Sequence, residues 1–107
     1  MSTKSKKKNS TIISLIDKLL TTDMYHPHIV ENTNRQLNNA ILTHIKKDKI
    51  GSDKHLYLKI KDVTDQLTIL SHAAMNQPIL VRTISNRQYE TIQHELKQLK
   101  HKLQHSK

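Results

Sequence analysis

The chain has 107 residues, a formal net charge of +9 and no Cys, Trp or Phe. This length fits one domain with a tail or two. The absence of cysteine excludes disulfides, thiolate metal sites and cysteine nucleophiles, and it predicts an intracellular protein, nuclear in a eukaryote and otherwise cytoplasmic or nucleoid-associated. No run approaches the roughly 20 apolar residues of a membrane span, so no membrane partner is expected. The core must be thin, which favours a homodimer, or a heterodimer with a similar small subunit.

The positive charge falls into three islands, which could follow a polyanion such as DNA. The first is acid-free and lies near the N-terminus, at Lys4, Lys6, Lys7 and Lys8. The second surrounds residues 56–60 and comprises Lys46, Lys47, Lys49, Lys54, Lys59 and Lys61. The third closes the chain with Lys97, Lys100, Lys102 and Lys107. The alternative is that these lysines only keep a small protein in solution.

The pattern predicts a mainly α protein. Residues 1–9 are expected to be a disordered basic tail, and residues 10–75 a helical DNA-binding and dimerisation unit. Its first helix covers about 11–21 after a Ser10 cap. A long second helix runs from 28 to about 49, with Pro27 in its first turn and Gly51 as its stop.

The second helix supplies the first half of a predicted core or dimer face, at Val30, Leu37, Ile41 and Ile45. Residues 56–60 alternate as a half-buried strand would, with Leu58 inward and Tyr57 outward. Asp62 is then expected to cap a third helix that reaches about residue 75.

Residues 76–107 are expected to form a C-terminal extension, a strand-like segment at 79–84 followed by an amphipathic helix at 86–104. Ser85 and Gln88 have the spacing of a capping box for this helix. Its apolar seam includes Leu96, Leu99 and Leu103, which complete the predicted core or dimer face. The seam spans about two heptads and can pack within the domain or pair with another chain as a coiled coil.

No constellation indicates catalysis, a metal or a cofactor. His26 and His28, and His101 and His105, form close pairs, but no carboxylate accompanies either pair and no metal-protease spacing occurs. The sequence lacks a glycine-rich phosphate loop and a nucleophile motif. The chain is therefore predicted not to be an enzyme.

Residues 10–72 resemble the histone fold, which has a short helix, a long central helix, a loop with a short strand, and a third short helix. Residues 54–63 resemble the segment that ends the second histone loop and begins the third helix. Asp62 matches the family's capping Asp, while His55 stands where the family commonly has an Arg. The resemblance implies a dimer whose phosphate-facing group is Lys54, Tyr57, Lys59 and Lys61.

A second resemblance is to winged-helix regulators of the MarR/SarA type. Residues 40–45 and 57–58 are similar to that family's helix and first strand, and residues 79–82 to the strand after the wing. Only one helix lies between the two segments, where the family has two. A third possibility is a coiled-coil adaptor without nucleic-acid binding.

The sequence thus predicts a small, non-enzymatic DNA-binding subunit that contacts duplex phosphates without reading bases. The expected nucleic-acid-binding residues are Lys4, Lys6, Lys7, Lys8, Lys46, Lys47, Lys54, Tyr57, Lys59 and Lys61.

Overall fold

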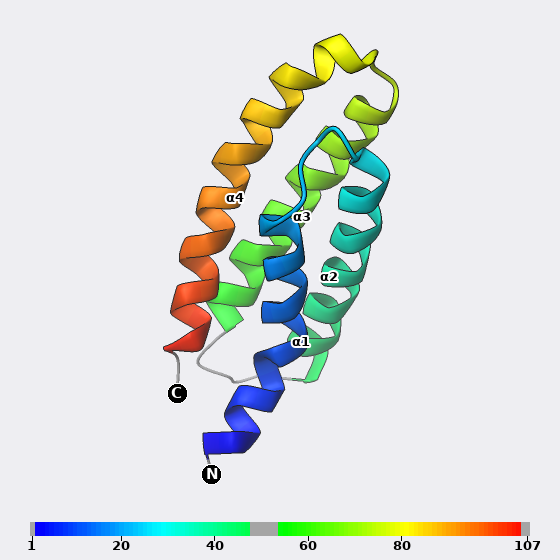
Figure 1. Ribbon diagram of the computed structural model, residues 1–107. Coiled ribbons are helices and arrows are strands. Elements are labelled where there is room, and N and C mark those ends of the chain that lie inside the picture. The colour runs from blue at the N-terminus through cyan, green and yellow to red at the C-terminus, as the bar shows by residue number, and fades with distance from the viewer. Residues whose placement is uncertain (1, 48–53, 106–107) are drawn as a thin grey trace.

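The computed structural model describes residues 2–47 and 54–105, with side chains from Asn9 onward. Within these ranges it contains four helices and a short 3₁₀ turn, and no strand. The elements are α1 (Ser2–Leu20), α2 (Pro27–Lys47), α3 (Lys54–Met75), η1 (Ile79–Val81) and α4 (Arg82–Gln104). Each helix runs antiparallel to the next along the chain, as Figure 1 shows. The prediction of a mainly α protein is confirmed, and the predicted stop at Gly51 lies outside the described residues.

The predicted strand at 56–60 is wrong, because these residues form the first turns of α3. The burial of two neighbouring residues shows why. Tyr57 is fully buried and Leu58 is 50% exposed, the reverse of what the strand required. The short alternation is the beginning of a helical stripe of buried residues that continues along α3 to Ala74. Asp62 consequently lies inside the helix and caps nothing.

The predicted strand at 79–84 is also wrong. Pro78 has an extended backbone and precedes the 3₁₀ turn, which passes directly into α4 at Arg82. Helix α4 therefore starts four residues before the predicted 86. Ser85 lies within its first turn, and its hydroxyl donates to Gln77 Oε1 at 3.0 Å instead of serving a capping box.

The helices before residue 50 occur where they were predicted, with different bounds. Pro27 does begin α2, which is described as far as Lys47, and its predicted end near residue 49 lies outside the described residues. Helix α1 begins at Ser2, so residues 2–9, for which the sequence predicts a disordered tail, continue the first helix. Asn9 is buried and accepts a hydrogen bond from the Tyr57 hydroxyl, 2.8 Å away. This contact ties the expected tail to α3.

A polar seam joins α2 to α3, the pair of helices with the most extensive contact. Asn34 Nδ2 donates to the Thr64 carbonyl and to Thr68 Oγ1, both at 3.0 Å. One turn further along α2, Asn38 Oδ1 accepts from the Thr64 hydroxyl at 3.0 Å. Asparagine is a poor helix former, and these bonds show what its presence in α2 provides instead. They fix the register of the two helices.

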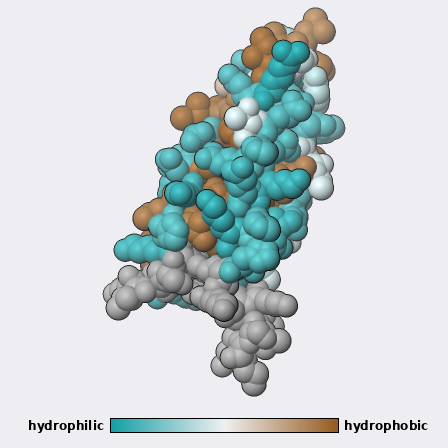
Figure 2. Space-filling model, turned by 90° about the vertical axis from the view of Figure 1, so that its left-hand side faces the viewer, coloured by the Kyte–Doolittle hydropathy of each residue, from teal (hydrophilic) through white to brown (hydrophobic). Residues whose placement is uncertain are grey.

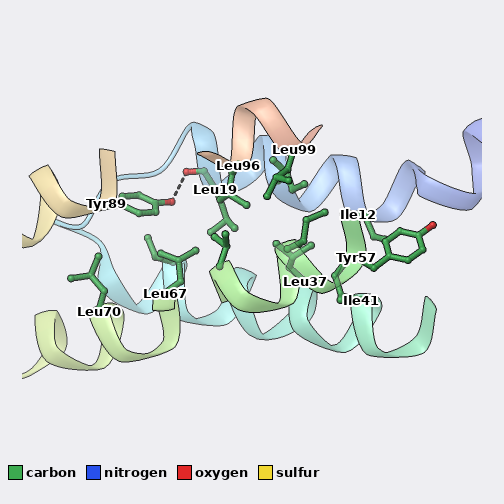
Figure 3. Close-up of a cluster of buried hydrophobic side chains, with 14 of the residues drawn as sticks. Ile12, Leu19, Leu37, Ile41, Tyr57, Leu67, Leu70, Tyr89, Leu96 and Leu99 are labelled. Carbon is green, nitrogen blue, oxygen red and sulfur yellow. Dashed lines mark hydrogen bonds between the residues drawn. The ribbon is translucent and has the colours of Figure 1, made fainter. Parts of the chain in front are cut away.

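Helix α4 is tied to the end of α1. The Tyr89 hydroxyl donates a hydrogen bond to the Leu19 carbonyl. Gln93 Nε2 donates to the carbonyls of Leu19 and Thr22 at 2.9 and 3.0 Å. Figure 3 shows the Tyr89 bond among the apolar side chains of the core. These donors satisfy carbonyls that a helix end leaves without an intrahelical partner.

The predicted core residues are used within a single chain. Val30, Leu37 and Ile41 of α2 are fully buried, and they share one core with Leu96, Leu99 and Leu103 of α4. Ile45 is partly buried against it. The seam of α4 therefore packs within the domain, and this set of residues is not a free dimer face.

Candidate nucleic-acid interface

One end of the bundle gathers segments that are far apart in the sequence. The first turns of α1 and α3 and the last turns of α2 and α4 all lie there, with the two chain ends, as Figure 1 shows. This is a consequence of four antiparallel helices of similar length. We call this region the basic end, because each of the three basic islands contributes to it.

The basic end presents lysine side chains from three helices. Six of them are exposed: Lys46 and Lys47 of α2, Lys54 and Lys59 of α3, and Lys97 and Lys102 of α4. Residues 2–8, which include Lys4, Lys6, Lys7 and Lys8, form the first turns of α1. The structure thus brings the predicted cations of α2 and α3 together, and it adds two that the sequence did not assign to the site. The signal for those two was the run of lysines with no acid after Glu95.

Two other lysines near this end are held by acids of the same chain. Lys61 Nζ lies 2.6 Å from Asp65 Oδ1, and Lys100 Nζ lies 2.5 Å from Asp17 Oδ1. Both lysines are only partly exposed. A phosphate would have to compete with a carboxylate for each, so Lys61 is a weaker candidate than Lys59.

Tyr57 does not belong to the surface on which it was predicted. It is fully buried, its hydroxyl donates to Asn9, and its ring packs edge-on against His44 with 5.4 Å between centroids. Its place is in the core, and it cannot stack on a base or contact a phosphate there.

The opposite half of the bundle has balanced charge. Its described basic residues are Arg35, Arg82 and Arg87, and its acids are Asp23, Glu31 and Glu90. Asp17 and Asp65 pair with Lys100 and Lys61 near the basic end, and Asp62 and Glu95 lie in the halves of α3 and α4 that are nearer to it. Several of these pair with one another or with a neighbour, such as Arg35 with Glu31 at 2.8 Å. The excess positive charge of the chain therefore belongs to the basic end, which makes the molecule electrically polar along its long axis.

The histidines form no metal site in the described part of the chain, where no three potential ligands from His, Cys, Asp and Glu come together. The rings of His101 and His105 lie 4.3 Å apart between centroids on the exposed face of α4. An open depression on this face is lined by His94, Lys97, Gln98, Lys100, His101, Lys102 and Gln104. Its lining consists of lysines, histidines and glutamines, and the lysines add to the positive character of the basic end.

Comparison with protein-family models, with curated proteins and with solved structures finds no match. Among the described residues, no helix combines the length and the apolar character needed to cross a membrane. A function is therefore proposed from the geometry of the basic end.

Proposed function

We propose that the protein is a non-enzymatic DNA-binding subunit that holds duplex phosphates at its basic end. The observation that carries this proposal is the convergence of lysines from α2, α3 and α4 at one end, while the other half stays balanced in charge. Clustered exposed cations attract a polyanion and release its counterions, which is the main source of sequence-independent affinity.

The kind of cation favours contact with phosphate over base reading. All the described cations of the basic end are lysines, whereas the three arginines lie in the other half. Arginine reads guanine edges with two parallel hydrogen bonds, while lysine acts as a point charge. Because Tyr57 is buried, it adds no stacking surface. These features support weakly selective binding.

The DNA-binding proposal does not include the short strand that the histone resemblance implies, since residues 56–60 are helical. It also leaves aside the winged-helix alternative, whose two strands are helical or 3₁₀ here. The third possibility, an adaptor whose lysines only solubilise it, is the one that the experiment must separate.

The test is a titration of a short duplex at several salt concentrations with two variants of equal charge. One is Lys46→Gln with Lys47→Gln at the basic end, and the other is Arg35→Gln with Arg87→Gln in the other half. With six lysines engaged, log affinity should fall against log salt with a slope of about −5. The Lys46/Lys47 variant should flatten this slope by about 2, and the control should leave it nearly unchanged.

Equal weakening by both variants would show that net charge alone attracts the duplex and would overturn the site. Affinity that does not change with salt would overturn DNA binding and favour the adaptor. Sequence-unrelated duplexes should compete equally well. A clear preference for one sequence would contradict the phosphate-only mode of contact.

A further inference from the structure

The second half of α4 carries three exposed histidines, His94, His101 and His105. His101 and His105 lie one turn apart where the helix ends, and their ring centroids are 4.3 Å apart. His101 also lines the open depression on this face, together with Lys97 and Lys102. We call His101 and His105 the histidine pair. Figure 2 views the molecule from the side of α4, where the surface is mostly hydrophilic.

The histidine pair continues a row of basic residues along α4. Lys97, His101 and His105 are spaced four residues apart, which places their side chains on one face of the helix with about 6 Å of rise between neighbours. Lys97 is one of the exposed lysines of the basic end. The last acid of the sequence is Glu95, before the row begins. The pair therefore lies among the cations that the proposed function assigns to the duplex.

Helices α1 and α3 pack against α4 and bring their own charges to this region. The charged or titratable groups on residues 9–20 of α1 and 54–65 of α3 are Asp17, Lys18, Lys54, His55, Tyr57, Lys59, Lys61, Asp62 and Asp65. Asp17 and Asp65 are each ion-paired with a lysine, and Asp62 is exposed. In the described part of the chain, no acid is ion-paired with the histidine pair. A positive charge on the pair is therefore not neutralised from within the chain.

Two histidines in the other half of the bundle do have acidic partners. His26 Nδ1 lies 3.1 Å from Asp23 Oδ1, and His72 Nε2 lies 3.8 Å from Glu31 Oε1. A protonated imidazole at either position is beside a carboxylate of its own chain. The histidine pair, in contrast, offers its N–H groups to an anion from outside.

We infer that the histidine pair is a further phosphate-binding surface of the basic end, and that it binds a duplex only while its imidazoles are protonated. This inference rests on the proposed function. Histidine is the side chain whose charge ordinarily changes between about pH 5 and 8. A protonated imidazole carries two N–H donors and forms charge-assisted hydrogen bonds to phosphate oxygens, whereas a neutral one has no charge with which to displace counterions. The pair therefore makes duplex affinity depend on pH.

The direction of this dependence follows from linkage. A phosphate beside an imidazole favours its protonated form, so the complex binds more protons than the free protein and the free duplex. Because the coupling is reciprocal, a lower pH strengthens duplex binding and a higher pH weakens it. Lysine side chains ordinarily stay charged over this range, so their share of the affinity does not change.

A metal ion fits the pair less well than phosphate does. Among the described residues, no third potential ligand from His, Cys, Asp and Glu joins the two imidazoles, and Lys97 and Lys102 on the same face would repel a divalent cation. A metal would also reverse the effect of pH, because imidazole binds metals in its neutral form.

The test is a titration of a short duplex at several salt concentrations, at about pH 8 and about pH 5.5, with a chelator present. The slope of log affinity against log salt should steepen from about −5 at the higher pH to about −7 at the lower, because two more phosphates are contacted. At a fixed salt concentration, affinity should rise by about tenfold or more.

His101→Gln with His105→Gln should keep the slope measured at the higher pH and lose most of the change at the lower pH. His26→Gln with His28→Gln is the matched control, since it also removes two exposed histidines close together in the sequence, but in the other half of the bundle. This control should behave like the wild type at both pH values. Circular dichroism at both pH values should confirm that the two variants fold.

Two further histidines lie near the basic end. His44 is partly buried, with Nδ1 2.8 Å from the Ala40 carbonyl oxygen and its ring against Tyr57. His55 is exposed in the first turn of α3. His55→Gln should remove less of the pH effect than the variant of the pair, because it removes one imidazole and leaves the row on α4 intact. A larger loss from His55→Gln would overturn the assignment to the pair.

The results separate this inference from the proposed function. Duplex binding with the same salt slope at both pH values would refute the histidine inference alone and leave the lysine site standing. The absence of duplex binding at either pH would refute both. Equal loss of the pH effect in the His26/His28 variant would overturn the role of the pair. Binding that strengthens with rising pH and disappears when the chelator is added would assign the pair to a metal ion instead.

Discussion

The Tyr89 hydroxyl donates a hydrogen bond to the main-chain carbonyl of Leu19, 70 residues earlier in the chain. Tyr89 is fully buried, and burial raises the pKa of its phenol far above the ordinary 10.0 because the phenolate would be desolvated. The group therefore stays protonated in the folded protein and remains a donor. This bond connects the first and last helices of the bundle.

Tyr89→Phe should lower the free energy of unfolding by about 1 kcal/mol at neutral pH, since Gln93 still serves the same carbonyl. The raised folded pKa stabilises the protein below pH 10, and this contribution is lost as pH rises further, because only the unfolded chain releases the proton. The variant should therefore lose stability less steeply above pH 10 than the wild type. Urea melts at several pH values measure both effects. Tyr25→Phe, at an exposed hydroxyl, is the control, and equal behaviour of the two variants would refute the role of Tyr89.

Leu37→Ala and Ile41→Ala should each lower the free energy of unfolding by about 2–5 kcal/mol, because both side chains are fully buried in the shared core. Leu42→Ala, at a side chain that is 39% exposed, should cost much less. Chemical denaturation compares the three. A large loss of unfolding free energy in Leu42→Ala, with little change in Leu37→Ala, would mean that the buried face of α2 is assigned wrongly.

Asn34→Ala should destabilise the protein by about 1 kcal/mol, since it removes the two hydrogen bonds from Asn34 Nδ2 to α3, while the Thr68 hydroxyl still donates to the Thr64 carbonyl. Asn39→Ala, on the exposed face of α2, provides the comparison and should change little. Helix propensity alone would make both substitutions stabilising. Thermal melts of the two variants therefore show whether the polar seam or helix propensity determines how the asparagines of α2 affect stability.

Thr33→Val should leave stability unchanged or raise it. The Thr33 hydroxyl is buried and has no hydrogen-bond partner among the described residues. Replacing it by a methyl group of similar shape removes a desolvated polar atom at no cost in packing. A loss above about 1 kcal/mol would show that the hydroxyl has a partner after all, such as an ordered water. Differential scanning calorimetry provides the measurement.

Lys59→Ala should weaken duplex binding and flatten the salt slope by about 1, whereas Lys61→Ala should do less. The reason is the ion pair of Lys61 with Asp65, which already satisfies that cation. Asp65→Ala should free Lys61 and strengthen binding. A fluorescence anisotropy titration ranks the three, and a larger effect from Lys61 than from Lys59 would contradict the assignment.

Local pattern determined where the helices of the N-terminal half lie and where the charges occur. Proline at the start of α2 and the apolar spacing of Leu37 and Ile41 are properties of a few neighbouring residues, and both predictions agree with the structure. The three basic islands are visible in the sequence itself. Their convergence at one end of the bundle cannot be seen in the sequence, because it depends on the lengths and directions of all four helices together.

The tertiary structure decided the secondary structure of those segments whose hydrophobic pattern fits both a strand and a helix. Residues 56–60 alternate well enough for a strand, and only the continued burial from Ile60 to Ala74 makes the same residues part of a helix. Tyr57 is a core residue because it lies on the buried face of α3, and Asn9, 48 positions away, satisfies its hydroxyl by accepting a hydrogen bond. Likewise, the α4 seam packs within the domain because α1 and α3 offer a matching apolar face nearby. Contacts between residues this far apart decide burial, and no window of neighbouring residues contains them.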